Sequence, residues 1–143
     1  MPGVASYVAA DQLHQVLSEV DALVLACPLT EQTRGLNGAT EFGLMRQGSV
    51  LVNNSRGPVV DEEALVSALR AGHLGGACLD VFATEPLPAG SPLWDMPNVI
   101  VSPHSAATVA VENGLLTDLF IDNLQRWLAG KPLRNTYDRA AGY

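Results

Sequence analysis

Four short, nearly continuous apolar runs constrain the fold of this chain more than any other feature. They occupy residues 22–28 (ALVLACP), 49–55 (SVLVNNS), 75–81 (GGACLDV) and 98–103 (NVIVSP), and helical or polar stretches separate them. Strands that are apolar at successive positions are typical of a sheet covered on both faces, and helical crossovers between them make the sheet parallel. We therefore expect an α/β domain built on a parallel, doubly wound sheet.

Helical periodicity predicts the elements around these strands. A helix is expected over residues 10–21, with Asp11 as its N-cap and an apolar face made of Leu13, Val16, Leu17 and Val20. A short helix closing at Gly48 precedes the second strand, and a helix over residues 62–71 follows it, capped by Asp61.

A long amphipathic helix follows the last strand and ends at Gly130 and Pro132. Its apolar side is made of Leu116, Leu119, Phe120, Leu124, Trp127 and Leu128.

Composition excludes several classes of partner. The chain has 143 residues, enough for one domain, and its 15 acidic and 8 basic residues give a net charge of −7. Nucleic-acid binding requires a basic patch, and the sequence has none, so we expect no nucleic-acid partner. No apolar run is long enough to span a membrane. We expect no secretion signal, no metal site, reduced cysteines and a cytoplasmic location.

Chemically reactive side chains follow the predicted strands. Arg56 comes after the second strand, Asp80 and then Glu85 after the third, and His104 after the fourth. In open parallel sheets, ligands bind outside the carboxyl ends of the strands. We therefore expect these four side chains to meet at one edge of the sheet.

Together these residue types suit a substrate with a carboxylate beside a carbonyl or hydroxyl. A guanidinium such as that of Arg56 grips a carboxylate through two parallel hydrogen bonds. His104, oriented by Glu85, could transfer a proton. Each residue also has a simpler interpretation: Arg56 as a solvated loop charge, Glu85 as a loop acid, and His104 as a helix cap. Their convergence on one edge favours the functional interpretation.

The chain resembles the D-isomer-specific 2-hydroxyacid dehydrogenases from about Asp11 to Pro132. Three linked motifs carry the resemblance: N-x-x-R-G at residues 53–57, L-D-V-F-x-x-E-P at 79–86 and P-N-V-x-x-x-P-H at 97–104. The resemblance implies that Arg56 binds the substrate carboxylate and that Glu85 and His104 form the acid/base pair. It further implies a Rossmann-like domain whose cofactor-binding positions are Cys27, Pro28, Thr33, Asn54, Ser55, Arg56, Asp80, His104, Ser105 and Ala106.

The implied reaction is hydride transfer between NAD or NADP and the C2 carbonyl of a small 2-oxo acid, such as glyoxylate or hydroxypyruvate. His104 is the implied proton donor in reduction, and Asp80 the acceptor for the nicotinamide amide. For the full-length form we expect an oxidoreductase that is a homodimer.

The sequence contains no G-x-G-x-x-G fingerprint. We therefore expect residues 1–143 to be a partial NAD(P)-binding domain, with 105–143 as a helix and tail that pack on a substrate domain. As a fragment, the chain is expected to have no appreciable turnover alone, and its strand at 22–27 to become an exposed sheet edge. The alternative is a catalytically inactive module that binds a nucleotide or another chain.

Overall fold

The computed structural model describes residues 7–140 and divides into two compact units. The first unit is Met1–His104, and the second is Ser105–Tyr143. The candidate site residues up to His104 all lie in the first unit.

The first unit is built on a parallel sheet. Within residues 7–140 the sheet has four strands in the order β1-β2-β3-β4, so each strand pairs with its neighbour in sequence. The strands are β1 (Ala22–Leu25), β2 (Val50–Asn53), β3 (Gly76–Leu79) and β4 (Val99–Val101). Each lies within one of the four apolar runs, which confirms the parallel sheet predicted from them.

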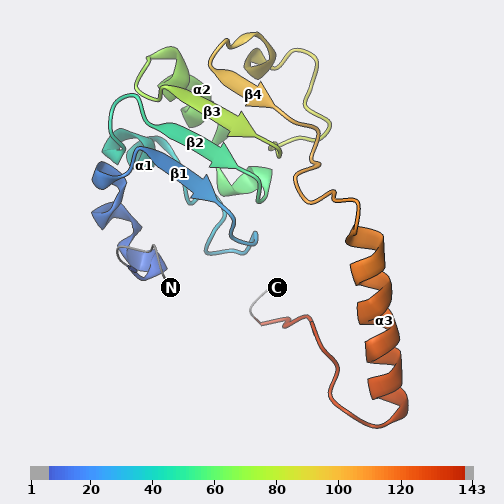
Figure 1. The fold of residues 1–143 in the computed structure, drawn as a ribbon. Helices are drawn as coiled ribbons and strands as arrows, with labels where there is room; N and C mark the ends of the chain where they lie inside the picture. The colour runs from blue at the N-terminus through green and yellow to red at the C-terminus, as the bar shows by residue number, and fades with distance from the viewer. Residues whose placement is uncertain (1–6, 141–143) are drawn as a thin grey trace. The chain divides into compact units, whose positions relative to one another are not determined.

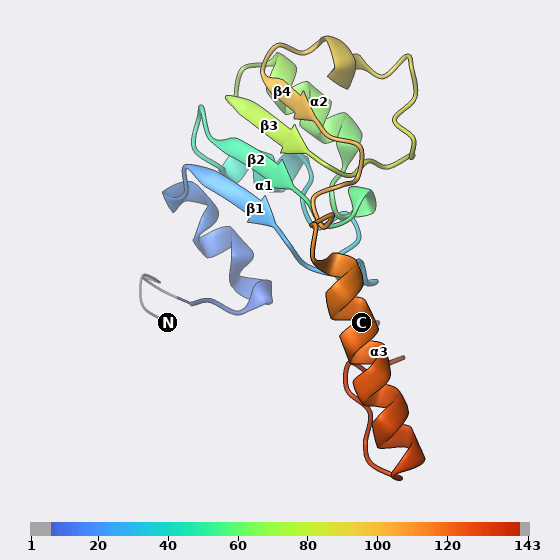
Figure 2. The ribbon, with the colours of Figure 1, turned by 45° about the vertical axis from the view of Figure 1, so that its right-hand side comes forward.

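Helices α1 (Ala39–Leu44) and α2 (Glu62–Arg70) lie on the same face of this sheet (Figures 1 and 2). The core between these helices and the sheet contains fully buried side chains such as Leu51 and Leu65. Asp61 caps α2 as predicted, because its Oδ1 accepts a hydrogen bond of 3.1 Å from the Ala64 amide. The cap fixes where the chain turns back after β2, close to the carboxyl edge of the sheet.

The opposite face of the sheet carries an apolar row that the structure leaves partly open. The strand register aligns Val24, Val52, Cys78 and Ile100 across the four strands. Val24 is 58% exposed and Ile100 66% exposed. The prediction of strands buried on both faces is therefore wrong for this unit, because α1 and α2 cover the same side. The expectation that the strand at 22–27 lies at the sheet edge is confirmed by the position of β1.

The predicted helix over residues 10–21 is instead two short 3₁₀ helices, Ala10–Gln15 and Leu17–Glu19. Hydrogen bonds from the Val16 amide to the Leu13 carbonyl, and from Glu19 to Val16, have the three-residue spacing of this tighter helix. Ala9, not Asp11, is the N-cap residue. The β-branched Val16 between the two segments and the neighbouring Ser18 are poor α-helix formers. One residue of the predicted apolar face, Leu17, is nevertheless fully buried in the core.

The second unit contains α3 (Glu112–Leu128), which confirms the predicted long helix. Five of the six residues expected on its apolar side are exposed, with values from 44% for Leu124 to 72% for Leu128. Gly130 ends the helical region with φ of +63°, a conformation that glycine adopts easily.

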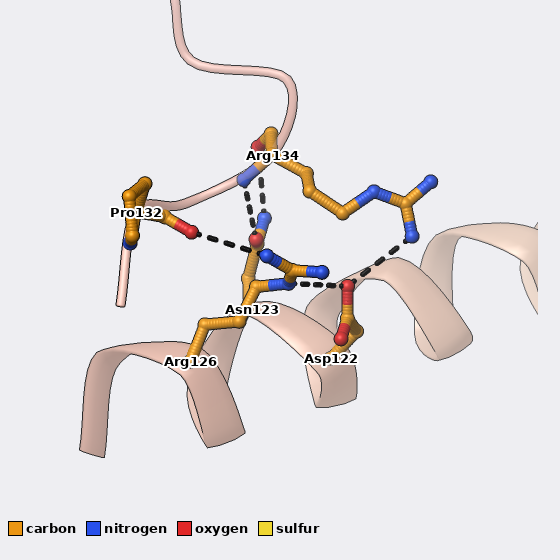
Figure 3. A network of polar contacts seen from close by, with 5 residues as sticks. All are labelled: Asp122, Asn123, Arg126, Pro132 and Arg134. Carbon is orange, nitrogen blue, oxygen red and sulfur yellow. Dashed lines mark hydrogen bonds and ion pairs between the residues drawn. The ribbon is translucent and has the colours of Figure 1, made fainter. Parts of the chain in front are cut away.

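A polar network joins α3 to the tail that follows it (Figure 3). Asp122 Oδ2 accepts hydrogen bonds from Arg126 at 2.9 Å and from Arg134 at 3.2 Å. Asn123 forms two reciprocal hydrogen bonds with the backbone of Arg134, at 2.8 and 3.0 Å. The Arg126 hydrogen bond is the main cause that lowers the pKa of Asp122. Arg126 also donates a hydrogen bond of 3.4 Å to the Pro132 carbonyl, so side chains on two successive turns of the helix hold the tail.

None of the helices among residues 7–140 combines the length and the apolar composition needed to cross a bilayer.

Candidate functional site

The carboxyl ends of all four strands lie at the same end of the sheet (Figure 1). We call this end the carboxyl edge, as distinct from the outer strands β1 and β4. Arg56, Asp80 and His104 each follow one of these ends within three residues, and Glu85 lies on the loop after β3. The structure thus places the four predicted side chains on the loops of one edge, as the parallel topology requires.

Glu85 and His104 form a direct pair. Nδ1 of His104 lies 2.7 Å from Oε2 of Glu85, and the other carboxylate oxygen, Oε1, accepts a hydrogen bond of 3.0 Å from the Phe82 amide. Both side chains are partly open, at 47% exposed for His104 and 36% for Glu85. The carboxylate is thus held at both oxygens, and it fixes the orientation of a ring that remains accessible to a ligand.

His104 adopts a backbone conformation that is rare for residues with a side chain. Its φ is +55°, in the left-handed region, which costs about 1–3 kcal/mol for a residue other than glycine. Such conformations persist where the surroundings determine them, and they cluster at functional sites. The hydrogen bond to Glu85 is one contact that holds His104 in this position.

The surroundings of Glu85 favour its charged form. Hydrogen bonds from His104 and from the Phe82 amide lower the pKa of the carboxyl from its ordinary value of 4.5, and the charges of His104 and Arg56 act in the same direction. Glu85 is therefore an anion at neutral pH. The charge of Arg56 is the smallest of these causes.

The loop that carries Arg56 is organised by a buried asparagine. Asn53 Oδ1 accepts hydrogen bonds from the amide and the hydroxyl of Ser55, at 3.1 and 2.8 Å, and its Nδ2 donates to the Arg56 carbonyl at 3.2 Å. The exposed Arg56 side chain donates from one Nη to the Ser55 carbonyl at 2.6 Å. Among residues 7–140 its guanidinium forms no ion pair, so the rest of the donor fork can meet a carboxylate ligand.

Gly57, next to Arg56, packs directly against the loop after β3. A Cβ atom at this position would lie 1.8 Å from the Phe82 carbonyl oxygen and 2.6 Å from the Ala83 nitrogen. No side chain fits in that space, so glycine is required by the close approach of two backbone segments. The contact fixes the loop carrying Arg56 against the loop carrying Glu85.

Asp80 is buried at the end of β3, with 7% of its surface exposed. The Ser102 hydroxyl donates a hydrogen bond of 2.5 Å to Asp80 Oδ1, across the parallel register that pairs Leu79 with Val101. A carboxylate oriented in this way suits an amide donor such as the carboxamide of a nicotinamide ring. Asp80 therefore fits the nicotinamide of the predicted cofactor.

The remaining predicted cofactor residues lie on separate loops. After β1, Thr33 Oγ1 donates to the Pro28 carbonyl at 2.7 Å and accepts from the Thr30 amide at 2.7 Å, which closes the loop that follows the half-buried Cys27. Asn54 is exposed beside the buried Ser55. Ser105 and Ala106 belong to the second unit.

A cavity of about 570 Å³ adjoins the Glu85–His104 pair on the side of β4. Its lining residues are Phe82, Glu85, Pro86, Leu87, Trp94, Val101, Ser102, Pro103 and His104. The wall is largely apolar, and the Trp94 ring is oriented by a hydrogen bond of 3.0 Å from Nε1 to the Pro88 carbonyl. No group of His, Cys, Asp and Glu in the described part of the chain could hold a metal ion.

Sequence reasoning missed three residues of this edge: Asn53, Glu62 and Ser102. Ser102 follows β4 where Asp80 follows β3, so the parallel register could have predicted their contact. Asn53 is a polar residue inside an apolar run, which is a sign of a buried hydrogen-bonding role. Glu62 accepts a hydrogen bond of 3.0 Å from the Ala83 amide, and nothing local in the sequence indicates that contact.

Comparison with known proteins agrees with this geometry. Residues 4–106 match the family model described as "D-isomer specific 2-hydroxyacid dehydrogenase, NAD binding domain". The chain is 43% identical over 123 residues to a protein named glyoxylate/hydroxypyruvate reductase B from Escherichia fergusonii, covering 86% of this chain and 38% of that protein.

Solved structures also resemble the chain. A D-isomer specific 2-hydroxyacid dehydrogenase from Xanthobacter autotrophicus Py2, in complex with NADPH and MES, is 44% identical with a TM-score of 0.86, and the match covers 93% of this chain and 54% of that one. An NADPH-dependent glyoxylate/hydroxypyruvate reductase from Sinorhizobium meliloti, in complex with NADP and sulfate, is 39% identical with a TM-score of 0.91, covering 100% and 46%.

The chain spans about half the length of these relatives or less. The parallel α/β sheet has the Rossmann-like fold of their NAD-binding domains, of which it forms a part, as predicted. The prediction of NAD or NADP as the cofactor is also confirmed, by the family model and by the dinucleotides in the related structures. The chain belongs to the D-isomer specific 2-hydroxyacid dehydrogenase family.

Proposed function

We propose that this chain supplies the proton-transfer and carboxylate-binding residues of an NAD(P)-dependent reductase of small 2-oxo acids. Glyoxylate and hydroxypyruvate are the proposed substrates, since related proteins carry both names. The observation that carries the proposal is the Glu85–His104 pair, with 2.7 Å between Oε2 and Nδ1, at the same carboxyl edge of the sheet as Arg56.

His104 is the proposed proton donor to the C2 oxygen of the substrate during reduction. Its Nδ1 is bound to Glu85, so Nε2 is the ring nitrogen that exchanges a proton with the substrate. Glu85 holds the ring in one orientation through this hydrogen bond. This division of roles resembles other acid/base pairs in which a carboxylate holds a histidine in one orientation.

Arg56 is the proposed site for the substrate carboxylate. A fork of donors beside the histidine would fix both ends of a 2-oxo acid, with the carboxylate at the guanidinium and the carbonyl at the ring. Arg56 forms no ion pair among the described residues, and it lies on a loop braced by Asn53; both observations support this role.

The nicotinamide dinucleotide, when bound, supplies the hydride. Asp80 is the proposed acceptor for the nicotinamide amide, held in place by Ser102. Cys27, Pro28, Thr33, Asn54 and Ser55 are proposed to line the dinucleotide, and the cofactor-binding roles of Ser105 and Ala106 stay predictions. The homodimer and the cytoplasmic location expected from the sequence stay predictions.

We also propose that the chain alone does not turn over. The absence of a G-x-G-x-x-G in the sequence and the coverage of only about half of each relative support this. The test is to mix the purified chain with NADH or NADPH and with glyoxylate or hydroxypyruvate, and to follow absorbance at the wavelength of the reduced nicotinamide. Oxidation of the cofactor above the blank would overturn this part of the proposal.

The catalytic roles are tested in a chimera. The chain replaces the matched 46% of the Sinorhizobium meliloti reductase, and NADPH binding is checked first by fluorescence. A chimera that binds NADPH and reduces glyoxylate or hydroxypyruvate supports the function. A chimera that binds NADPH yet reduces neither acid contradicts it.

A further inference from the structure

Two successive amides after β3 are each held by a different carboxylate. The Phe82 amide donates to Glu85 Oε1, and the Ala83 amide donates to Glu62 Oε2, both at 3.0 Å. Glu85 lies on the same loop as these amides, whereas Glu62 is the first residue of α2. The backbone that orients Glu85 is therefore itself anchored to another element.

Glu62 is well placed for this contact. Asp61 sets the start of α2, and the following residue is half-buried in the first turn, where the partial positive charge of the helix favours a carboxylate. A hydrogen bond from an amide to a carboxylate is stronger than one to a neutral acceptor. The exposed neighbour Glu63 has the same charge in the same turn, but its side chain makes no hydrogen bond in the described part of the chain.

Gly57 contacts the same peptide unit from the other loop. Its backbone approaches so closely that a Cβ would lie 2.0 Å from the Phe82 carbonyl carbon and 2.6 Å from the Ala83 nitrogen. The peptide between Phe82 and Ala83 is thus packed against Gly57 and hydrogen-bonded by Glu62. Both of these residues lie on the segment that leads from β2 through Arg56 into α2.

We propose that Glu62 is a positioning residue of the site: by holding the Ala83 amide, it fixes the Phe82 amide that orients Glu85 against His104. The proposal rests on the proposed function for the roles of Glu85 and His104, and it adds a residue that touches neither substrate nor cofactor. It also explains how the loops of Arg56 and Glu85 keep their spacing, since α2 begins only six residues after Arg56.

The test uses the purified 143-residue chain and three substitutions of Glu62. Glu62→Ala removes the acceptor. Glu62→Asp keeps the charge at the helix N-terminus but shortens the side chain by one methylene group. Glu62→Gln keeps an acceptor oxygen at full reach. Glu63→Ala is the matched control, because it removes the same charge from the same turn.

Two measurements by NMR report on the loop without substrate. We expect Glu62→Ala and Glu62→Asp to speed hydrogen exchange of the Ala83 amide and to shift the pKa of Glu85 upward, toward its ordinary value. Glu62→Gln is expected to restore most of both properties, and Glu63→Ala to leave both unchanged. If Glu62→Ala does not fold, the same two measurements on Glu62→Asp test the proposal. Unchanged Ala83 exchange and an unchanged pKa of Glu85 in folded Glu62→Asp would overturn the proposal.

In the active chimera, Glu62→Asp should lower kcat and change its pH profile while leaving KM for the 2-oxo acid close to its original value. A purely structural role would leave the pH profile unchanged. Because the NMR measurements need no turnover, a failure of the proposed function leaves them interpretable, and a failure of the positioning role leaves the activity of the chimera intact.

Discussion

The imidazole Nδ1 of His104 and the carboxylate Oε2 of Glu85 lie 2.7 Å apart, although the two residues are 19 positions apart in sequence. They follow neighbouring strands, β3 and β4, whose carboxyl ends meet at one edge of the sheet. The contact therefore depends on the parallel register, and it gives the site its acid/base chemistry.

Removing the imidazole should raise the pKa of Glu85. In His104→Ala the carboxyl loses the hydrogen bond that contributes most to its lowered pKa, and the Phe82 amide and the charge of Arg56 remain to lower it against the opposing effect of burial. The pKa is expected to move up toward 4.5 but to stay below it. A carbon-detected NMR titration of the Glu85 carboxyl measures this; an unchanged pKa would show that the pair is not formed in solution.

The same pair makes stability depend on pH in a defined direction. Folding lowers the pKa of Glu85, so its contribution to stability is complete above the ordinary value of 4.5 and is lost as the pH falls through the folded-state value. Urea denaturation between pH 7 and pH 3 should therefore show a smaller loss of stability for His104→Ala than for the unsubstituted chain. An equal or larger loss in the variant contradicts the linkage.

Substitution of Gly57 by alanine should be strongly destabilising. The new Cβ would overlap the Phe82 carbonyl, and displacing that backbone costs about 1–3 kcal/mol. Gly43, inside α1, is the control, because a Cβ there meets nothing within 4 Å. Gly43→Ala should stabilise the helix by about 0.5–1 kcal/mol. Urea denaturation measures the free energy of unfolding of both variants. Equal changes in Gly57→Ala and Gly43→Ala would contradict the close approach of Gly57 to the Phe82 carbonyl.

Loss of the α2 cap should destabilise the first unit. Asp61→Ala removes the acceptor for the Ala64 amide, which costs about 1 kcal/mol for a typical N-cap. Asp61→Asn keeps an acceptor of the same length and should recover most of the loss. Urea denaturation compares the free energy of unfolding of the two variants. An asparagine variant as unstable as the alanine variant would show that the negative charge of Asp61, and not its hydrogen bond to the Ala64 amide, stabilises the helix.

Activity in the chimera should depend on His104 and Arg56 in different ways. His104→Ala should lower kcat by about 10²–10⁴, the range of general acid–base catalysis. Arg56→Lys keeps the charge but loses the planar donor fork, so it should raise KM for the 2-oxo acid more than it lowers kcat. NADPH affinity serves as the control. A His104→Ala chimera that retains full activity would remove His104 from the proposed mechanism.

The sequence predicted those features that follow from a local pattern. The apolar runs located all four strands, the capping aspartate at position 61 located α2, and the residues after each strand gave the edge on which Glu85 and His104 meet. The open apolar row through Val24 and Ile100 could not be predicted from those runs, because an apolar strand looks the same whether one face or both are covered. The 3₁₀ geometry near Val16 has the same apolar spacing over such a short segment as an α-helix, so the sequence pattern did not distinguish the two.

Contacts between backbone segments were the least predictable part of the site. Gly57 packs against the Phe82 carbonyl, and Glu62 accepts a hydrogen bond from the Ala83 amide. Both contacts depend on how two loops pack against each other, and neither loop has a periodic sequence pattern. Such contacts involve main-chain atoms, which every residue has, so the identity of the residues alone cannot locate them.

The order of the strands has a consequence for how the first unit assembles and opens. Because each strand pairs with the next in sequence, every pairing closes a loop of similar, modest length, and strands can be added one after another without a long-range search. Among residues 7–140, β1 and β4 each have a strand partner on one side only, whereas β2 and β3 have partners on both. Backbone opening should therefore begin at β1, whose Val24 is exposed, and reach the central pair last, so that the strands leading to Arg56 and Asp80 are the most persistent part of the sheet.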